Sequence, residues 1–235
     1  YYYASGKSVL KPSLATLLPD WRIMKDVCKV GFSAFFNQLG IAFSVSVFNK
    51  VFLDCGGEIA LAAYGVLQRC NSLIIMPILG LSQGMIPIVG YNWGARNFPR
   101  VRQAFFLSIF FASIHCCLGA ALLFFFPDKL VGLFSKDPQL LAIGAAGGRI
   151  LSMGLIFAGF QLLASGFYQG VGRALPSLSF SVLRQFVLIT PLVWALARLY
   201  GLQGAWWAFP IANATSFLIM LLFFLYDHGK NIKNN

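Results

Sequence analysis

Amide and guanidinium side chains interrupt the long apolar stretches of this chain, and they are the groups that could do chemistry there. A polar group inside hydrocarbon costs free energy unless it faces protein or a water-filled cavity, so these residues indicate a polar pathway. The chemistry would be hydrogen bonding and charge pairing with a ligand. Six of these residues are our candidates for a cavity lining: Asn37, Gln38, Gln68, Arg69, Gln161 and Arg184.

Arginine is the most demanding of these residues, because it cannot shed its proton. Arg69, Arg149 and Arg184 lie within apolar stretches, whereas the seven acids all lie at or beyond the ends of those stretches. We therefore expect these arginines to have no counter-ion at their own depth, and to face a wet cavity or an acid outside this chain. Asn71 and Asn213 are instead expected to form hydrogen bonds between helices.

The sequence contains no recognisable catalytic or metal-binding pattern. His115 and His228 stand alone, and no serine has a basic partner in a known motif. The five cysteines lie mostly in apolar stretches without a CxxC spacing, so they predict neither a disulfide framework nor a zinc site. We expect no enzyme activity, no cofactor and no metal.

The composition predicts a membrane protein built from helices. Hydrophobic residues make up 58% of the chain, charged residues only 11%, and the mean hydropathy is +0.75. Soluble domains carry roughly 25% charged residues. Apolar stretches of about 20 residues or more can cross the bilayer as helices. The chain has six such spans, at about 28–53, 59–91, 104–126, 139–168, 175–199 and 202–226, so we expect an all-α bundle of six transmembrane helices.

The positive charges indicate how the bundle sits in the membrane. The formal net charge is +11, and most lysines and arginines outside the spans lie on the side that holds the N-terminus. Cytoplasmic loops of membrane proteins carry such an excess. We therefore expect both ends of this chain to be cytoplasmic and the bilayer, not a nucleic acid, to be the partner of the basic residues, since no basic soluble segment with interleaved aromatics exists.

Glycine and proline gather where the second span ends. The stretch 80–97 reads GLSQGMIPIVGYNWGARN, and a further proline interrupts the fifth span. Proline breaks the helical hydrogen-bond ladder, and glycine permits a bend or a close helix contact. We expect this inner end of the second span to be deformable. The candidate hinge residues are Gly80, Gln83, Gly84, Pro87, Gly90 and Pro191.

These motifs together resemble one family of transporters. Stretch 80–97 with the FPRV that follows it resembles a signature region of the multidrug and toxic compound extrusion (MATE) family. The same likeness extends to Gly31-Phe32 with Asn37-Gln38, to Phe160-Gln161 with GFYQGVGR at 166–173, and to Leu183-Arg184-Gln185 ahead of Pro191. It covers nearly the whole chain.

The resemblance implies a fold and an activity. MATE proteins have twelve helices in two six-helix lobes, and they exchange cationic or amphipathic drugs for protons or sodium ions across the cell membrane. By this resemblance the chain is the C-terminal lobe, a fragment that would pair with an N-terminal lobe. Its parts would be 1–27, the end of the inter-lobe connection and an entry helix; 28–226, the six-helix lobe; and 227–235, a cytoplasmic tail.

The chain departs from one branch of that family. That branch places acids for the coupling cation in the helices that correspond to the first and fourth spans, where this chain has Asn37, Gln38 and Arg149. The resemblance therefore implies that H+ or Na+ is bound in the N-terminal lobe. Two alternatives remain: a flippase for lipid-linked oligosaccharide with the same broad architecture, which a basic cleft would suit, and a membrane scaffold subunit that transports nothing.

Overall fold

The computed structural model describes residues 21–227, apart from the side chains of 22–23, 25–38, 174, 177 and 178. The chain divides into two compact units, residues 1–39 and 40–235. In the first unit, residues 21–39 form the helical start of α1 (Trp21–Gly94). The description below concerns residues 40–227, in which every regular element is a helix.

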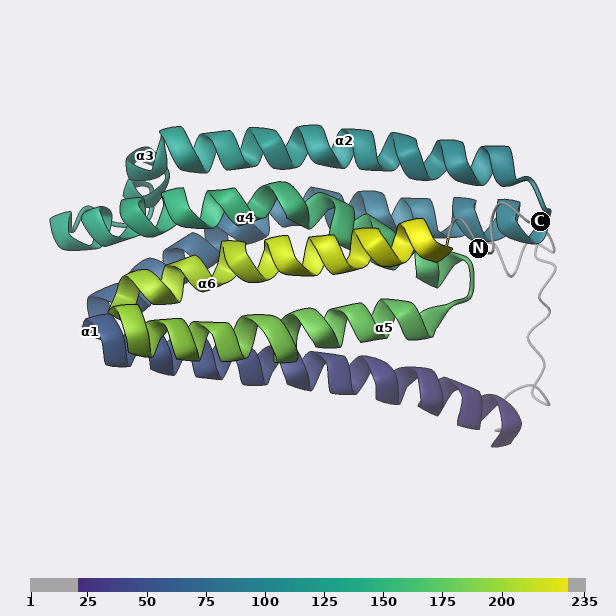
Figure 1. Ribbon diagram of the computed structural model, residues 1–235, viewed down its shortest axis with the longest axis horizontal. Helices are drawn as coiled ribbons and strands as arrows, with labels where there is room; N and C mark the ends of the chain where they lie inside the picture. Colours follow the sequence, from purple (N-terminus) through teal and green to yellow (C-terminus); the bar gives the residue numbers. More distant parts are fainter. Residues whose placement is uncertain (1–20, 228–235) are drawn as a thin grey trace, which may run out of the picture. The chain divides into compact units, whose positions relative to one another are not determined.

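Six long helical legs make up this part of the chain. The elements after α1 are α2 (Phe98–Phe125), the short α3 (Pro127–Gly132), α4 (Pro138–Gly170), α5 (Ala174–Val182), the π-helix η2 (Leu183–Ile189) and α6 (Thr190–Asp227). Both α1 and α6 contain one glycine with a left-handed backbone, Gly57 (φ 70°) and Gly201 (φ 61°). The chain reverses direction at each of them, so α1 and α6 each form two legs (Figure 1).

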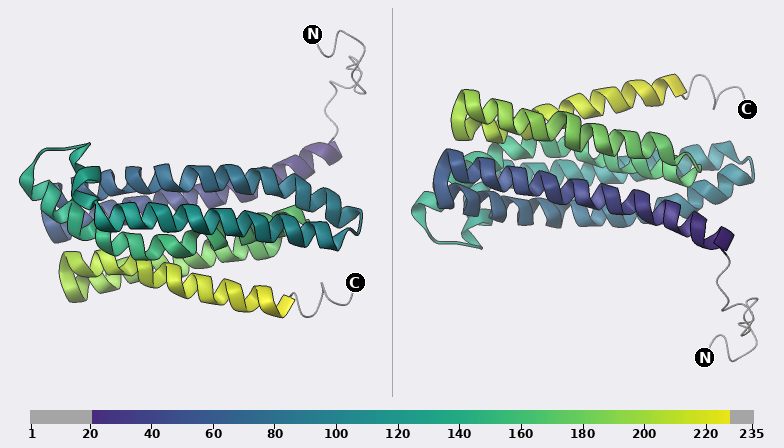
Figure 2. Two further views of the ribbon diagram at one scale, coloured as in Figure 1. Left: turned by 90° about the horizontal axis from the view of Figure 1, so that it is seen from above. Right: turned by 90° about the horizontal axis from the view of Figure 1, so that it is seen from below.

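The membrane-capable helices agree with the expected fold. Four helical segments are long and apolar enough to cross a bilayer: Leu39–Gly94, Phe98–Phe125, Pro138–Gly170 and Ser179–Asp227. The first and last of these contain the two reversal glycines, which gives six spans. The prediction of an all-α bundle with six transmembrane helices is therefore confirmed, and the turns fall where the sequence placed them. Figure 2 shows the legs lying side by side along one axis.

Local sequence explains where the legs begin. Asp137 precedes α4, and its carboxylate accepts the backbone N–H groups of Gln139 (2.8 Å) and Leu140 (3.3 Å). Such a cap satisfies backbone donors that have no partner inside the helix. Proline occupies the first position of both α3 and α4, where its missing N–H costs nothing.

Helix α4 is the centre around which the other legs pack. Its small residues allow close approach: a Cβ added at Gly147 would lie 2.7 Å from the indole of Trp206, and one at Gly154 would lie 3.0 Å from the backbone of Pro210. Both partners belong to the last leg of α6. These glycines thus let the last leg of α6 pack closely on α4, and α4 brings Gln161 into the interior of the bundle.

Candidate functional site

A cavity of about 270 Å³ lies within residues 40–227 and is lined in part by polar side chains. Its polar lining comes from the second leg of α1, from η2 and from the last leg of α6. These residues are Gln68, Asn71, Arg184, Gln185 and Asn213. Its apolar wall includes Ile41, Val45 and Phe48 on the first leg of α1, Leu155 on α4 and Phe209 on α6.

A chain of hydrogen bonds holds Arg184 in place. The guanidinium Nη1 of Arg184 donates to the side-chain oxygen of Gln161 at 3.2 Å. The side-chain nitrogen of Gln161 donates in turn to the backbone carbonyl of Asn213 at 2.7 Å. Gln161 is only 5% exposed, and both ends of its amide are engaged, so it fixes the direction in which the guanidinium points. This arrangement links α4, η2 and α6.

The π-helix that carries Arg184 and Gln185 has its own support. The Thr190 hydroxyl donates to the backbone carbonyl of Gln185 at 2.7 Å, and it lies 3.0 Å from the hydroxyl of the buried Ser44. The backbone N–H of Thr190 also donates to the Gln185 carbonyl, five residues earlier in the chain, which is the hydrogen-bond spacing of a π-helix. Pro191 follows directly and has no N–H to continue the ladder. Single π-turns of this kind occur frequently at functional sites.

The charge of Arg184 has no acidic partner among the described residues. Asp128 pairs with Arg149 at 3.6 Å, Asp227 pairs with Arg173 at 2.9 Å, and Asp137 caps α4. Asp54 and Glu58 flank the reversal at Gly57. Among the described residues that line the cavity there is no acid. The prediction that Arg149 lacks a counter-ion is therefore wrong, because α3 folds Asp128 back beside it, whereas for Arg184 the described residues supply none.

Only some of the other predicted cavity residues lie at the cavity. Gln68 lines the cavity, and Gln161 is hydrogen-bonded to Arg184 of its lining. Arg69 has an exposed side chain and is not part of the lining. The side chains of Asn37 and Gln38 lie outside the described residues. The lining also includes three residues that were not among our cavity candidates: Asn71, Gln185 and Asn213. The sequence signal for one of them was spacing, because Gln68 and Asn71 lie three residues apart and so share one face of a helix.

The hinge candidates occupy two settings. Gly80, Gln83, Gly84 and Pro87 lie on the exposed side of the second leg of α1, and no described atom would come within 4 Å of a Cβ at Gly80 or Gly84. Gly90 instead meets the backbone carbonyl oxygen of Gly170, which would lie 3.0 Å from its Cβ. Pro191 lies exposed just after η2. Close helix contact thus explains Gly90, and a bend remains the interpretation of the other five.

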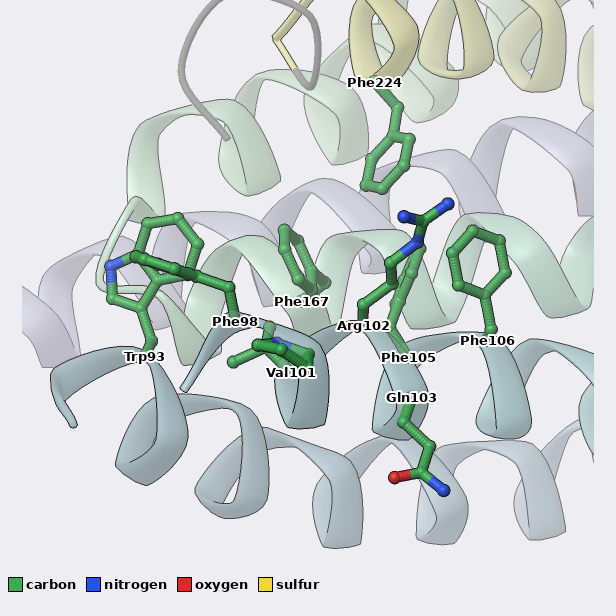
Figure 3. Close-up of a pocket in the computed structure, with 10 residues that line it drawn as sticks. Trp93, Phe98, Val101, Arg102, Gln103, Phe105, Phe106, Phe167 and Phe224 are labelled. Atoms are coloured by element: carbon green, nitrogen blue, oxygen red, sulfur yellow. The ribbon is translucent and has the colours of Figure 1, made fainter. Parts of the chain in front are cut away.

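A larger groove, of about 620 Å³, lies at the end of the bundle where α2 begins (Figure 3). Its lining is aromatic, with Trp93, Phe105, Phe106, Phe167 and Phe224 around the exposed Arg102. The Arg102 guanidinium lies over the Phe106 ring, 5.5 Å from its centroid. None of the predicted cavity or hinge residues lines this groove. The polar interior cavity is therefore the candidate functional site.

Comparison with known proteins agrees with this architecture. The chain is 25% identical over 223 residues to the multidrug export protein MepA of Staphylococcus aureus (strain bovine RF122 / ET3-1), which covers 94% of this chain and 48% of MepA. It is also 25% identical over 221 residues to MepA of Staphylococcus saprophyticus, with the same coverage. The chain thus spans about half the length of the curated relatives it matches.

Solved structures show the same fold. One described as the outward-facing conformation of a multidrug resistance MATE family transporter superposes with a TM-score of 0.83 at 23% identity, covering 95% of this chain and 51% of the other. A MATE crystal structure in a straight conformation gives 0.83 at 24% identity, covering 94% and 51%. The MatE family model matches residues 33–195, more than half of the sequence. The chain belongs to the MatE family.

Proposed function

We propose that this chain is one lobe of a secondary active transporter that exports cationic or amphipathic drugs and other xenobiotics across the cell membrane in exchange for protons or sodium ions. The observation that carries the proposal is the polar cavity around Arg184, placed inside an apolar helical bundle of the MatE family. Polar groups at such a depth are costly and mark substrate or ion pathways. The proposed partners are the bilayer, small organic cations and a second six-helix lobe.

Alternating access explains why a half would be organised in this way. In transporters built from two repeats, substrate and ion sites lie near the bilayer midplane, and one repeat rocks against the other. Arg184 lies ten residues into the leg that begins at Ala174, which is about 15 Å of helix. The cavity of this lobe is therefore placed at a depth where a second lobe could complete it.

The cavity residues should affect transport more than folding. In a full-length transporter that contains this lobe, Gln68→Ala and Gln161→Ala should reduce dye efflux about tenfold or more, because the first removes a polar group of the cavity lining and the second removes the amide that orients Arg184. Efflux of a fluorescent cationic dye from cells measures this, with the amount of protein in the membrane quantified in parallel. The matched control is Gln203→Ala, since Gln203 is exposed and outside the cavity. If expression falls and efflux per protein molecule does not, these residues are structural.

The coupling ion is assigned by elimination to the second lobe. Intramembrane carboxylates are common proton and cation sites in transporters, and the described lining of this cavity includes none. We propose that a carboxylate of the N-terminal lobe, which would pair with this chain, binds the ion. Neutralising that lobe's intramembrane acids one at a time should identify a variant in which an imposed ion gradient no longer drives efflux. Undiminished coupling in every variant would contradict the assignment.

The hinge proposal concerns the second leg of α1. Gly84 and Pro87 are exposed and make a regular helix less rigid there. Replacing both with alanine should slow turnover several-fold and leave the equilibrium affinity for the dye unchanged, because lid and helix movements often limit the rate. Gly65→Ala, at another glycine of this leg without a close neighbour, is the control. Turnover equal to that of the parent protein would exclude the hinge.

The two alternatives fit the structure less well. A flippase for lipid-linked oligosaccharide would be favoured by a basic cleft, yet of the three arginines in the spans Arg69 is exposed away from the cavity and Arg149 is paired with Asp128. Only Arg184 lies in the cavity lining. A scaffold subunit would have no use for a polar cavity. Dye efflux distinguishes both alternatives from the drug exporter.

A further inference from the structure

We propose that the Arg184 cavity binds the carboxylate group of an amphipathic organic ligand, so that this lobe recognises the anionic end of its substrate. The inference rests on the proposed transport function and narrows its substrate class. It starts from the charge balance of the cavity, which contains one guanidinium and no described acid.

The guanidinium is presented in a way that suits a carboxylate. Arginine has five N–H donors in a planar fork and keeps its charge. Gln161 engages Nη1 through a neutral oxygen, which orients the fork without neutralising it. The same Gln161 donates a hydrogen bond to the Asn213 carbonyl and is 5% exposed, so its own orientation is fixed by the bundle. A carboxylate is the group that pairs with such a fork through two parallel hydrogen bonds.

The remaining polar lining is compatible with a carboxylate. Gln68, Asn71 and Gln185 are amides, and each brings an NH2 group that donates hydrogen bonds. An ammonium group in this place would meet the arginine charge with no carboxylate to offset it. The described charged residues nearest in the sequence to these positions are Arg69, which is exposed, and Arg173, which is paired with Asp227.

The apolar wall indicates the rest of the ligand. Ile41, Val45 and Phe48 line the cavity from the first leg of α1, and Phe209 lines it from α6. Ile41 and Val45 are 41% and 38% exposed, so the cavity opens along this leg. A ligand with a carboxylate at Arg184 and a compact aromatic or aliphatic body along these side chains would satisfy both halves of the site. An inorganic anion would pair with Arg184 but would leave the apolar wall without a contact.

Binding of three matched probes tests the proposal without any transport. The probes are 4-phenylbutyrate, 4-phenylbutylamine and 4-phenylbutanol, which differ only in the charge of one end, and the protein is the full chain in lipid nanodiscs. Phenylbutyrate should bind about tenfold tighter than the amine, because hydrogen bonds to charged groups are the stronger ones. Equal affinities for all three, or tighter binding of the amine, would overturn the proposal. Acetate binding as tight as phenylbutyrate binding would overturn the amphipathic part.

Variants then locate the site. Arg184→Gln should weaken phenylbutyrate about tenfold and phenylbutanol much less, and the remaining phenylbutanol binding reports that the cavity has folded. Gln161→Glu should weaken phenylbutyrate similarly, because it supplies Arg184 with an internal carboxylate. The matched control is Arg198→Gln, an exposed arginine on the same leg that stacks on Trp194. Equal loss in the Arg198 variant, or full binding by the Gln161→Glu protein, would refute the site.

The outcome is separable from the transport proposal. If phenylbutyrate does not bind but the full-length transporter exports the dye, the carboxylate site is refuted and the transport proposal stands. If phenylbutyrate binds but no dye is exported, the transport proposal is refuted and the carboxylate site stands.

Discussion

The charge on Arg184 is the constraint on which the interior of this lobe depends. A guanidinium cannot become neutral, and its transfer into hydrocarbon is costly unless polar groups surround it. The fold meets this demand with elements distant in sequence: Gln161 from α4, the Asn213 carbonyl from α6 and the amides of the second leg of α1. The π-helix, held by Thr190 and Ser44, sets the position of the leg that carries the charge. The cavity is the space that these polar groups enclose.

Around this polar interior, packing is dense and apolar. Phe52 stacks on Tyr64 at 4.5 Å and lies 4.4 Å from Trp206, and at the other end Phe105 lies 5.0 Å from Phe224. The glycines of α4 let Trp206 and Pro210 approach its backbone. Such packing leaves little freedom within each half of the bundle. If the proposed transport function holds, we expect movement at the exposed glycines of α1 and at η2 and not within the aromatic clusters.

The sequence predicted the number and type of the helices because span length and charge distribution are local properties. The reversal near Gly57 was readable from its Asp-Cys-Gly-Gly-Glu surroundings. The sequence could not show which side of a helix faces inward. Gln68 and Arg69 are neighbours, yet Gln68 lines the cavity and Arg69 is exposed. It also missed the Asp128–Arg149 pair, because that contact depends on α3 folding back after Pro127. The π-helix arises from packing as well as from Pro191, so periodicity alone did not indicate it.

Water access to the cavity is the most direct test of the account, because a transport site must be hydrated and a scaffold core need not be. In a cysteine-free background of the full-length transporter, Gln68→Cys should react with a membrane-impermeant maleimide. Leu67→Cys should not, since Leu67 is adjacent in sequence but 0% exposed. Rapid labelling at position 68 with protection at position 67 is the predicted result. Protection at both positions in all transport conditions would contradict the claim that this polar cavity belongs to a transport pathway.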